Sequence, residues 1–292
     1  MSEVLIWEPE ADHENIREGA QDLQSELHRR VYEPYFANEG AAKSFLESPR
    51  TYWRKKVLEK FELFKGSPIS GVVMEIGAGT AWCAAYLSRR PLVERVFAVE
   101  YDRYALEHLM PKVFQHSNAR EEIIARVFGS YNHMPQVHNR VDLIVSIGAI
   151  HHSENLYATM SEAYKVLKPG GYFLATEPCE PNTLSVSAQI AKGESEDPAG
   201  LQKYGRQIKH KENSDHYYRV CEFEAAAYRA GLDVWAYVFD SSGSWWNSSD
   251  RAFVRRKVYN GYSNIVLRPY FARRSEGKRV FDRLMLIAQR PL

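Results

Sequence analysis

The sequence predicts an α/β fold with a mostly parallel β-sheet, and three observations support this prediction. From residue 71 onward, short apolar segments alternate with amphipathic helical segments, a pattern typical of strands joined by right-handed crossovers. Gly77 and Gly79 form a glycine-rich turn between the first such strand and the helix after it. The chain has 292 residues, of which 45% are hydrophobic and 26% are charged, as in an ordinary globular protein.

Seven apolar segments have the length and the flanking turn residues of strands. They are residues 71–76, 95–100, 123–128, 141–147, 172–176, 232–239 and 281–289. Helical periodicity and end signals predict the helices, which are residues 80–89, 102–115 with a kink at Pro111, 156–167 after an N-cap at Ser153, and 223–230. Residues 168–171 (KPGG) are predicted to form a turn before the fifth strand.

The rest of the chain divides into an N-terminal helical region and two insertions. Apolar residues at helical spacing predict helices over residues 16–31 and 52–64. We therefore expect residues 1–70 to form a helical cap on a domain of residues 71–292. Within that domain, residues 178–219 are polar and are interpreted as a lid. Residues 241–279 form a second insertion with nine Lys and Arg, two acidic and seven aromatic residues.

Composition argues against several classes of protein. No apolar stretch approaches the roughly 20 residues of a membrane-spanning helix, and the acidic N-terminus, broken by Pro9, is unlike a signal peptide. Three scattered cysteines without a C-x-x-C pair disfavour a disulfide framework or a zinc site. A formal net charge of +1 gives the whole chain no attraction to nucleic acid. We therefore expect a cytoplasmic protein with no bound metal, no membrane contact and a small-molecule partner.

The glycine-rich turn has an acidic residue beside it, which narrows the choice of ligand. Glu75 stands two residues before Gly77 in an E-x-G-x-G sequence. The glycines permit a sharp turn and close approach of the backbone to a ligand, at the sheet edge where ligands bind. A dinucleotide fingerprint would need a third glycine where Trp82 stands. A carboxylate would also repel a pyrophosphate, so the sequence predicts a ligand with a positive charge.

A second acidic residue, Glu100, ends the second predicted strand, 25 residues after Glu75. A carboxylate at this place can accept hydrogen bonds from both hydroxyls of a ribose. Such charge-assisted hydrogen bonds are worth about 1.5–3 kcal/mol each. The pair of acidic residues therefore suits a ligand that carries both a cationic group and a ribose.

On these residues the sequence resembles the class I S-adenosylmethionine-dependent methyltransferases, over roughly residues 71–239 and 281–289. Three further segments resemble that family in the same order: residues 141–152 (VDLIVSIGAIHH), 167–171 (LKPGG) and 230–234 (AGLDV). The resemblance implies a doubly wound, mostly parallel, seven-stranded sheet with an antiparallel last strand. It also implies S-adenosyl-L-methionine as the cofactor and methyl transfer as the activity.

The resemblance also implies a set of cofactor-binding residues. Gly77 and Gly79 would let the backbone pass the methionine part of the cofactor, and Glu75 would lie near its amino group. Glu100 would hold the ribose hydroxyls, and Tyr101 would pack against adenine. The full set is Glu75, Gly77, Ala78, Gly79, Glu100, Tyr101, Ser130, Tyr131, Ser146 and Ile147.

Two positions depart from the family pattern. Ala81 stands in place of a third glycine of the turn. Ser130 stands where many relatives carry an aspartate that binds the adenine amine. These departures support an alternative, a non-catalytic binding or scaffold protein that keeps the fold.

Three residues at the expected active edge are candidates for catalysis: His151, His152 and Glu177. Histidine titrates near working pH, so one of the pair could take a proton from a hydroxyl or an amine. Glu177 could orient a substrate hydroxyl. Alternatively, the two histidines pack locally at the start of a helix, and Glu177 is an ordinary charged residue without a role in catalysis. Methyl transfer can also proceed by desolvation and alignment of the reactants without a base.

The acceptor is expected to be a small molecule that is methylated on oxygen or nitrogen. The basic and aromatic residues of segment 241–279 suit an anionic acceptor, such as a sugar or a nucleotide-linked sugar. The same composition can bind nucleic acid through phosphate contacts and base stacking. An RNA or protein methyltransferase is therefore a further alternative.

Overall fold

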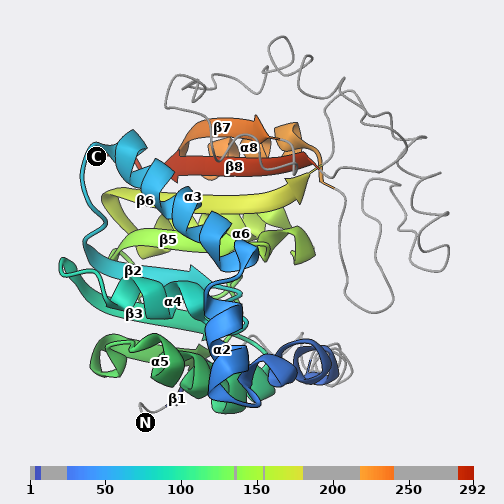
Figure 1. Cartoon of the computed structure of the whole chain (residues 1–292). Coiled ribbons are helices and arrows are strands. Elements are labelled where there is room, and N and C mark those ends of the chain that lie inside the picture. The colour runs from blue at the N-terminus through green and yellow to red at the C-terminus, as the bar shows by residue number, and fades with distance from the viewer. Residues whose placement is uncertain (1–3, 8–24, 135–136, 154, 180–217, 240–281) are drawn as a thin grey trace, which may run out of the picture.

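The structure is a computed structural model that describes residues 4–7, 25–134, 137–153, 155–179, 218–239 and 282–292. These residues form one sheet with helices on both of its faces (Figure 1). Within the described ranges, no helix combines the length and the apolar character needed to cross a membrane. The first part (residues 16–24) of the helix predicted over residues 16–31 lies outside the described residues, as do most of the predicted lid and the whole 241–279 insertion.

The sheet has eight strands in the order β1-β4-β3-β2-β5-β6-β8-β7. Their bounds are β1 Val4–Ile6, β2 Gly71–Ile76, β3 Val93–Glu100, β4 Ile124–Phe128, β5 Val141–Ile147, β6 Leu167–Cys179, β7 Asp233–Phe239 and β8 Asp282–Gln289. Pairing is parallel from β1 to β6, and β8 is antiparallel to both β6 and β7. All seven predicted strands are present, and the antiparallel last strand is confirmed.

The eighth strand, β1, corrects the purely helical interpretation of the N-terminal region. It pairs in parallel with β4 at the edge of the sheet. Trp7, directly after β1, donates its backbone N–H to the carbonyl of Phe128 at 3.0 Å. Its side chain is 1% exposed and lies beside Phe97, with ring centroids 6.3 Å apart. A strand of three residues is too short to show a periodicity in the sequence, so its pairing depends on a partner far along the chain.

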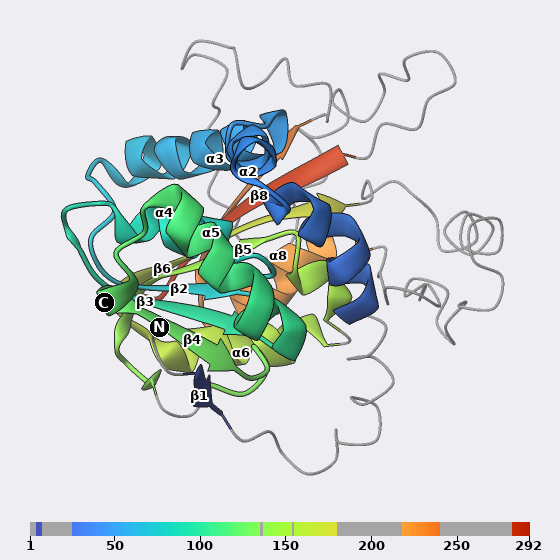
Figure 2. The same cartoon turned by 60° about the horizontal axis from the view of Figure 1, so that its bottom comes forward.

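Among the described residues, helices cover both faces of the sheet (Figure 2). On one face lie α3 (Pro49–Lys65), α4 (Trp82–Ser88) and α5 (Met110–Ser117), whose apolar side chains share one buried cluster. On the other face lie α6 (Leu156–Val166) and α8 (Val220–Arg229), which contribute to a second cluster. The sheet is therefore doubly wound, as predicted.

The first layer also contains helices at the N-terminal side of the chain. The predicted helix over residues 52–64 is part of α3, which Ser48 caps by accepting a hydrogen bond from Thr51 N at 3.4 Å. Gly66 ends α3 with a left-handed φ of 77°, a common conformation at the end of a helix. Residues 25–32 are helical (helix 25–32 below), and η2 (Glu33–Phe36) and α2 (Glu39–Leu46) follow. The last two elements were not predicted.

At Pro111, where a kink was predicted, the structure has a change of helix type. The π-helical turn η3 (Ala105–Leu109) runs directly into α5, whose first turn contains the proline. Proline lacks the N–H that a continuous α-helix would use at this place. A widened turn before it accommodates the missing bond.

Two local predictions after β5 are wrong. The N-cap of α6 is Asn155, whose side chain accepts from Ala158 N at 3.1 Å, whereas the Ser153 hydroxyl bonds to the Thr159 hydroxyl at 2.8 Å. Residues 168–171 form no separate turn but a bulge within β6, where the pairing with β5 shifts register between Val141 and Leu143. Both errors arise because the local signals, a hydroxyl and a Pro-Gly-Gly run, fit more than one structure.

Candidate functional site

The carboxyl ends of β2, β3 and β5 border a cleft of about 580 Å³. Residues of helix 25–32, α3 and β8 complete its wall. Ten of the thirteen residues predicted to form the site line this cleft: Glu75, Gly77, Ala78, Gly79, Glu100, Tyr101, Tyr131, Ile147, His151 and His152. The topology therefore brings together segments that are far apart in the sequence.

The other three predicted residues, Ser130, Ser146 and Glu177, are not among the residues that line the cleft. Ser146 and Glu177 are fully buried, and the Ser146 hydroxyl donates to Glu177 Oε1 at 3.0 Å. The hydroxyl of Ser130 accepts from the backbone N–H of Asn132 at 3.1 Å. A direct role of either serine in ligand binding therefore stays a prediction.

Gly77 and Gly79 give the turn after β2 its shape. Both have positive φ angles, 58° and 53°, which glycine adopts without the strain that a side chain would cause. A β-carbon on Gly77 would lie 2.4 Å from the Cβ of Ala149, so this glycine lets the turn pack against the loop after β5. A β-carbon on Gly79 would have His28 Nε2, 3.9 Å away, as its nearest neighbour outside the turn. Gly79 is therefore the glycine that keeps the cleft open beside the backbone.

Ala81 occupies the place of the third glycine in the same left-handed conformation, with φ 53°. A left-handed conformation costs a residue with a side chain about 1–2 kcal/mol. The Ala81 methyl group is fully buried. The turn therefore keeps its shape although the family's glycine is missing.

Glu75 lies in the floor of the cleft with 4% of its surface exposed. Its Oε2 accepts a hydrogen bond from Ala84 N, in the first turn of α4, at 2.7 Å. Burial raises the pKa of Glu75 to about 8, although the Ala84 N–H and the charge of Arg54 act in the opposite direction. A positively charged group next to Glu75 would favour its ionised form.

Glu100 ends β3 on the opposite side of the glycine-rich turn. Its Oε2 accepts from Gly79 N at 2.6 Å, and its Oε1 accepts from Tyr101 N at 2.9 Å and from Asp102 N at 3.1 Å. Burial also raises the pKa of Glu100, against the charge of His28 and the hydrogen bond from Gly79. Glu100 therefore fixes the turn and the residues after β3 to each other at the border of the cleft.

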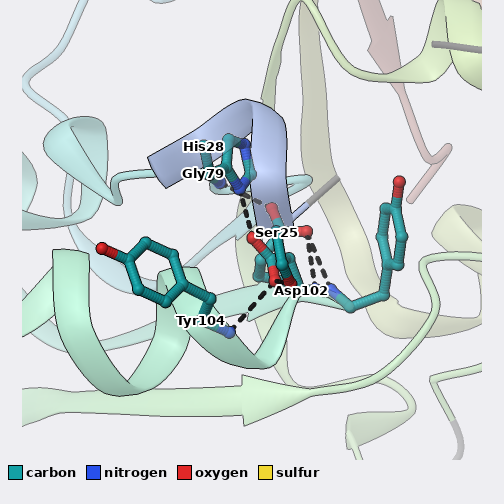
Figure 3. A network of polar contacts seen from close by, with 7 residues as sticks. Ser25, His28, Gly79, Asp102 and Tyr104 are labelled. Carbon is teal, nitrogen blue, oxygen red and sulfur yellow. Dashed lines mark hydrogen bonds and ion pairs between the residues drawn. The ribbon is translucent and has the colours of Figure 1, made fainter. Parts of the chain in front are cut away.

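A cluster around Asp102 was not predicted from the sequence (Figure 3). The Asp102 carboxylate, which has no exposed surface, accepts from the Ser25 hydroxyl, from His28 Nδ1 and, at 3.0 Å, from Tyr104 N. Burial alone would raise the pKa of Asp102, but the hydrogen bonds from His28 and Ser25 lower it overall. His28 is 6% exposed and lines the cleft. No local motif marks His28, because 74 residues separate it from Asp102.

His151, which lines the cleft, forms a second histidine–carboxylate pair with Glu177, which is buried beside it. His151 Nδ1 lies 2.7 Å from Glu177 Oε2. Glu177 Oε1 also accepts from the backbone N–H groups of Ala149 at 3.1 Å and Ile150 at 3.2 Å. Burial would raise the pKa of Glu177, but the hydrogen bond and charge of His151 lower it overall. The carboxylate is therefore ionised and orients the imidazole ring.

Part of the cleft wall is basic and aromatic. Trp53 and Arg54 of α3 line it together with Pro178 of β6 and Arg283 of β8. The guanidinium of Arg283 lies over the Trp53 ring, 5.0 Å from its centroid. His152 lines the same cleft, with its ring centroid 4.0 Å from that of His151.

These groups fit the cofactor that the sequence implies. The glycine-rich turn leaves open space beside Gly79, and two buried carboxylates, Glu75 and Glu100, border that space. Oxygen acceptors of this kind suit an ammonium group and a ribose diol. In the part of the chain that the structure describes, no group of three or more His, Cys, Asp or Glu side chains could hold a metal ion.

Comparison with known proteins identifies the segment that carries the cleft. Residues 74–175, which run from β2 into β6, match a family described as a methyltransferase domain. The biotin biosynthesis bifunctional protein BioHC of Teredinibacter turnerae is 29% identical over 132 residues, which are 44% of this chain and 23% of that protein. Malonyl-(acyl-carrier protein) O-methyltransferase 1 of Coxiella burnetii is 27% identical over 119 residues, which are 41% of this chain and 37% of that protein. The matches thus span less than half the length of these curated relatives.

Solved structures show the same fold at low sequence identity. A protein of Bacillus halodurans assigned as a methyltransferase has a TM-score of 0.54 and 17% identity, over 80% of this chain and 99% of that one. A protein of Galdieria sulphuraria assigned as a sarcosine dimethylglycine methyltransferase has a TM-score of 0.55 and 16% identity, over 82% and 86% of the two chains. Residues 74–175 therefore match a methyltransferase domain, and the chain shares its fold with these solved structures.

Proposed function

We propose that this chain transfers a methyl group from S-adenosyl-L-methionine to an oxygen or nitrogen atom of a small molecule, with His151 as the general base. The observation that carries the proposal is that His151, which is bonded to the buried Glu177, lines the same cleft as the glycine-rich turn. A base is useful where the attacking atom must lose a proton, as a hydroxyl or an ammonium group does. The name of the Coxiella burnetii relative, an O-methyltransferase, agrees with an oxygen acceptor.

The cofactor would be held by the turn after β2 and the end of β3. Glu100 would accept from the ribose hydroxyls, Glu75 would face the amino group, and Gly79 would let the backbone come close. When bound, S-adenosyl-L-methionine supplies a methyl group on a sulfonium that is open to direct displacement. The work of the protein is then to align the acceptor with that methyl group and to exclude water.

The proton of the acceptor would go to His151. Because Nδ1 is engaged by Glu177, Nε2 is the nitrogen that can take the proton. The ionised Glu177 carboxylate stabilises the imidazolium that results, and three protein donors besides His151 hold that carboxylate in place. An orienting carboxylate of this kind is a common partner of a histidine base.

The acceptor would lie toward Trp53, Arg54 and Arg283. Guanidinium groups favour phosphate or carboxylate groups, and an aromatic ring offers a flat surface for a sugar or a base. This end of the cleft supports an anionic small molecule, with nucleotide-linked sugars as the first candidates. The basic and aromatic segment 241–279 lies outside the described residues, so its part in acceptor binding stays a prediction.

The test is methyl transfer from S-adenosyl-L-methionine with a labelled methyl group to a panel of nucleotide sugars and carboxylated sugars. Once an acceptor is found, we expect His151→Asn to lower kcat by about 10²–10⁴-fold and Glu177→Gln to lower it in the same direction. His138→Asn is the matched control, because His138 faces Glu162 at 3.9 Å and does not line the cleft. It should leave kcat unchanged.

Two outcomes would contradict the proposal. If the protein binds the cofactor but transfers a methyl group to no acceptor, including RNA and protein substrates, a non-catalytic binding protein becomes the better account. If His151→Asn transfers at the rate of the wild type, the base assignment is wrong and alignment of the reactants is sufficient.

A further inference from the structure

Helix 25–32 presents two apolar side chains to the cleft, Leu27 and Val31. Leu27 is half-buried, and Val31 is 38% exposed. Neither of them belongs to the two apolar clusters that the described residues form on the faces of the sheet. Single exposed apolar residues are common on an open surface, whereas these two lie together in the wall of a ligand cleft.

Other side chains hold the helix in place. Ser25 and His28 both bond to the buried carboxylate of Asp102 (Figure 3). The guanidinium of Arg29 lies over the Tyr104 ring, 4.7 Å from its centroid. With about 3.6 residues per turn, residues 25, 28 and 29 lie on one stripe of the helix. This packing stripe faces the segment that follows β3, and it does not include the two apolar residues of the cleft wall.

Leu27 and Val31 form a second stripe beside the first. They are four residues apart, so they lie one above the other on the same side of the helix. Because the packing stripe faces Asp102, which follows β3, the apolar stripe is turned away from β3 and into the cleft. Tyr101, the predicted contact of adenine, directly follows β3. The apolar stripe is therefore on the side of the helix that is turned away from the predicted adenine site.

The chemistry of this stripe differs from that of the glycine-rich turn. Glu75 and Glu100 offer carboxylate oxygens to the polar groups of a ligand, whereas Leu27 and Val31 offer only hydrocarbon. Removal of apolar surface from water favours binding of a ligand that has an apolar part of its own. A ligand that is polar on all sides would gain nothing from this contact and would lose hydrogen bonds to water.

We propose that Leu27 and Val31 are specificity-determining residues for the methyl acceptor, and that the acceptor is an amphipathic anion with an aliphatic or aromatic part. The inference rests on the proposed function, in which the basic residues of the cleft wall meet the negative group of the acceptor. It deepens that function, because it places amphipathic acids ahead of nucleotide-linked sugars among the anionic acceptors.

The test compares two probes of equal charge and chain length, hexanoate and gluconate, which differ in the polarity of the chain. The full-length protein is saturated with the demethylated product of the cofactor and is titrated with each probe in a calorimeter. Hexanoate should bind about tenfold more tightly than gluconate or better. Val31→Thr, which exchanges a methyl group for a hydroxyl of similar size, should weaken hexanoate about 3- to 10-fold and leave gluconate unchanged. Adding Leu27→Gln should bring the two affinities to within about twofold.

Leu63→Gln is the matched control. Leu63 on α3 is 62% exposed and does not line the cleft, so this variant should keep the wild-type affinity for both probes. Thermal unfolding of each variant identifies any loss of binding that is due to unfolding. In every folded variant the affinity for the demethylated product should stay within about twofold of the wild type, because the apolar stripe lies outside the cofactor site.

Four results would overturn the inference. If hexanoate binds no more tightly than gluconate, or if neither binds, the cleft does not select an apolar group. If the folded double variant keeps the preference for hexanoate, other residues provide it. If Val31→Thr weakens the demethylated product as much as it weakens hexanoate, the side chain belongs to the cofactor site. If the wild type does not bind the demethylated product at all, the proposed function itself fails, and the inference fails with it.

Discussion

Acidic side chains at the glycine-rich end of the cleft determine which ligands it can take. Glu75 and Glu100 are both buried, and burial raises the pKa of each. The negative charge of Glu100 also disfavours ionisation of Glu75, because it raises the pKa of Glu75 further. A ligand with a cationic group relieves this repulsion, whereas an anionic ligand such as a pyrophosphate would add to it. The residue-level electrostatics therefore favour a sulfonium or ammonium compound.

The raised pKa of Glu75 predicts that cofactor binding releases protons. With a pKa of about 8, Glu75 is mainly protonated in the free protein at pH 7, and an ammonium group beside it favours its ionised form. Affinity should therefore rise with pH, by up to about tenfold per pH unit below pH 8, and level off above it. Calorimetric titration in buffers of different ionisation enthalpy measures the released protons. The control, Glu75→Gln, should show no such release, and equal proton release in both proteins would contradict the assignment.

The same shift predicts an effect on folding with a definite sign. The pKa of Glu75 is raised from 4.5 to about 8 on folding, so the folded protein binds the proton more tightly than the unfolded chain does. Its contribution to stability is fully present below pH 4.5 and is lost as the pH rises through 8. The free energy of unfolding of Glu75→Gln should accordingly fall less over this range than that of the wild type.

The two glycines of the turn predict opposite consequences for stability and binding. Gly79→Ala has room for its methyl group, so it should cost only the backbone strain, about 1–2 kcal/mol, but should weaken cofactor binding by narrowing the cleft. Gly77→Ala carries the same strain and in addition brings its methyl group to 2.4 Å from the Ala149 Cβ. It should therefore be the less stable variant in urea unfolding. Equal stabilities would show that the loop after β5 yields to the added methyl group.

Residues next to strand ends could be predicted, whereas residues brought in by tertiary contacts could not. Glu75, Glu100 and His151 each lie within a motif at the carboxyl end of a strand, and the cleft contains all three. His28 has no such signal, because its role depends on a partner 74 residues away. The bond between His151 and Glu177 could not be predicted either, since the sequence offered both residues only as separate candidates.

At the scale of elements, the sheet was predictable because its strands are apolar and are separated by clear helical segments. The seven predicted strands are all present, and the last of them is antiparallel to its neighbours, as predicted. The missed elements are short: β1 has three residues, η2 has four and α2 has eight. Such elements are held by contacts with distant segments and not by their own periodicity.

The edge strand β1 predicts that Trp7 contributes strongly to stability. Trp7 is 1% exposed and packs beside Phe97 and Gly129, so Trp7→Ala should lower the free energy of unfolding by about 3–5 kcal/mol. Tyr157→Ala is the control, because Tyr157 on α6 is 51% exposed and should change stability by less than about 0.5 kcal/mol. Urea unfolding measures both. A loss as small in Trp7→Ala as in the control would mean that β1 is not docked on β4 in solution.

At the scale of the whole molecule, the cleft is shared between the sheet and the N-terminal region. Strands β2 and β3 supply the acidic side chains of the cleft and the segment after β5 supplies His151, while helix 25–32 and α3 supply His28, Trp53 and Arg54. The expected division into a cap of residues 1–70 and a domain of residues 71–292 describes this sharing only in part, because β1 belongs to the sheet. The residues that line the cleft therefore come both from the sheet and from the N-terminal region of the chain.

Binding of S-adenosyl-L-methionine through Glu100 underlies every functional proposal above, and calorimetric titration measures this binding. The wild-type protein is titrated with S-adenosyl-L-methionine and with its demethylated product, beside Glu100→Ala and the milder Glu100→Gln, with thermal unfolding as the control for folding. We expect both ligands to bind the wild type with micromolar affinity. In each Glu100 variant that is folded, the affinity should fall by about tenfold or more. The assignment would be contradicted if neither ligand bound to the wild type. It would also be contradicted if the folded Glu100 variants bound the ligands with the affinity of the wild type.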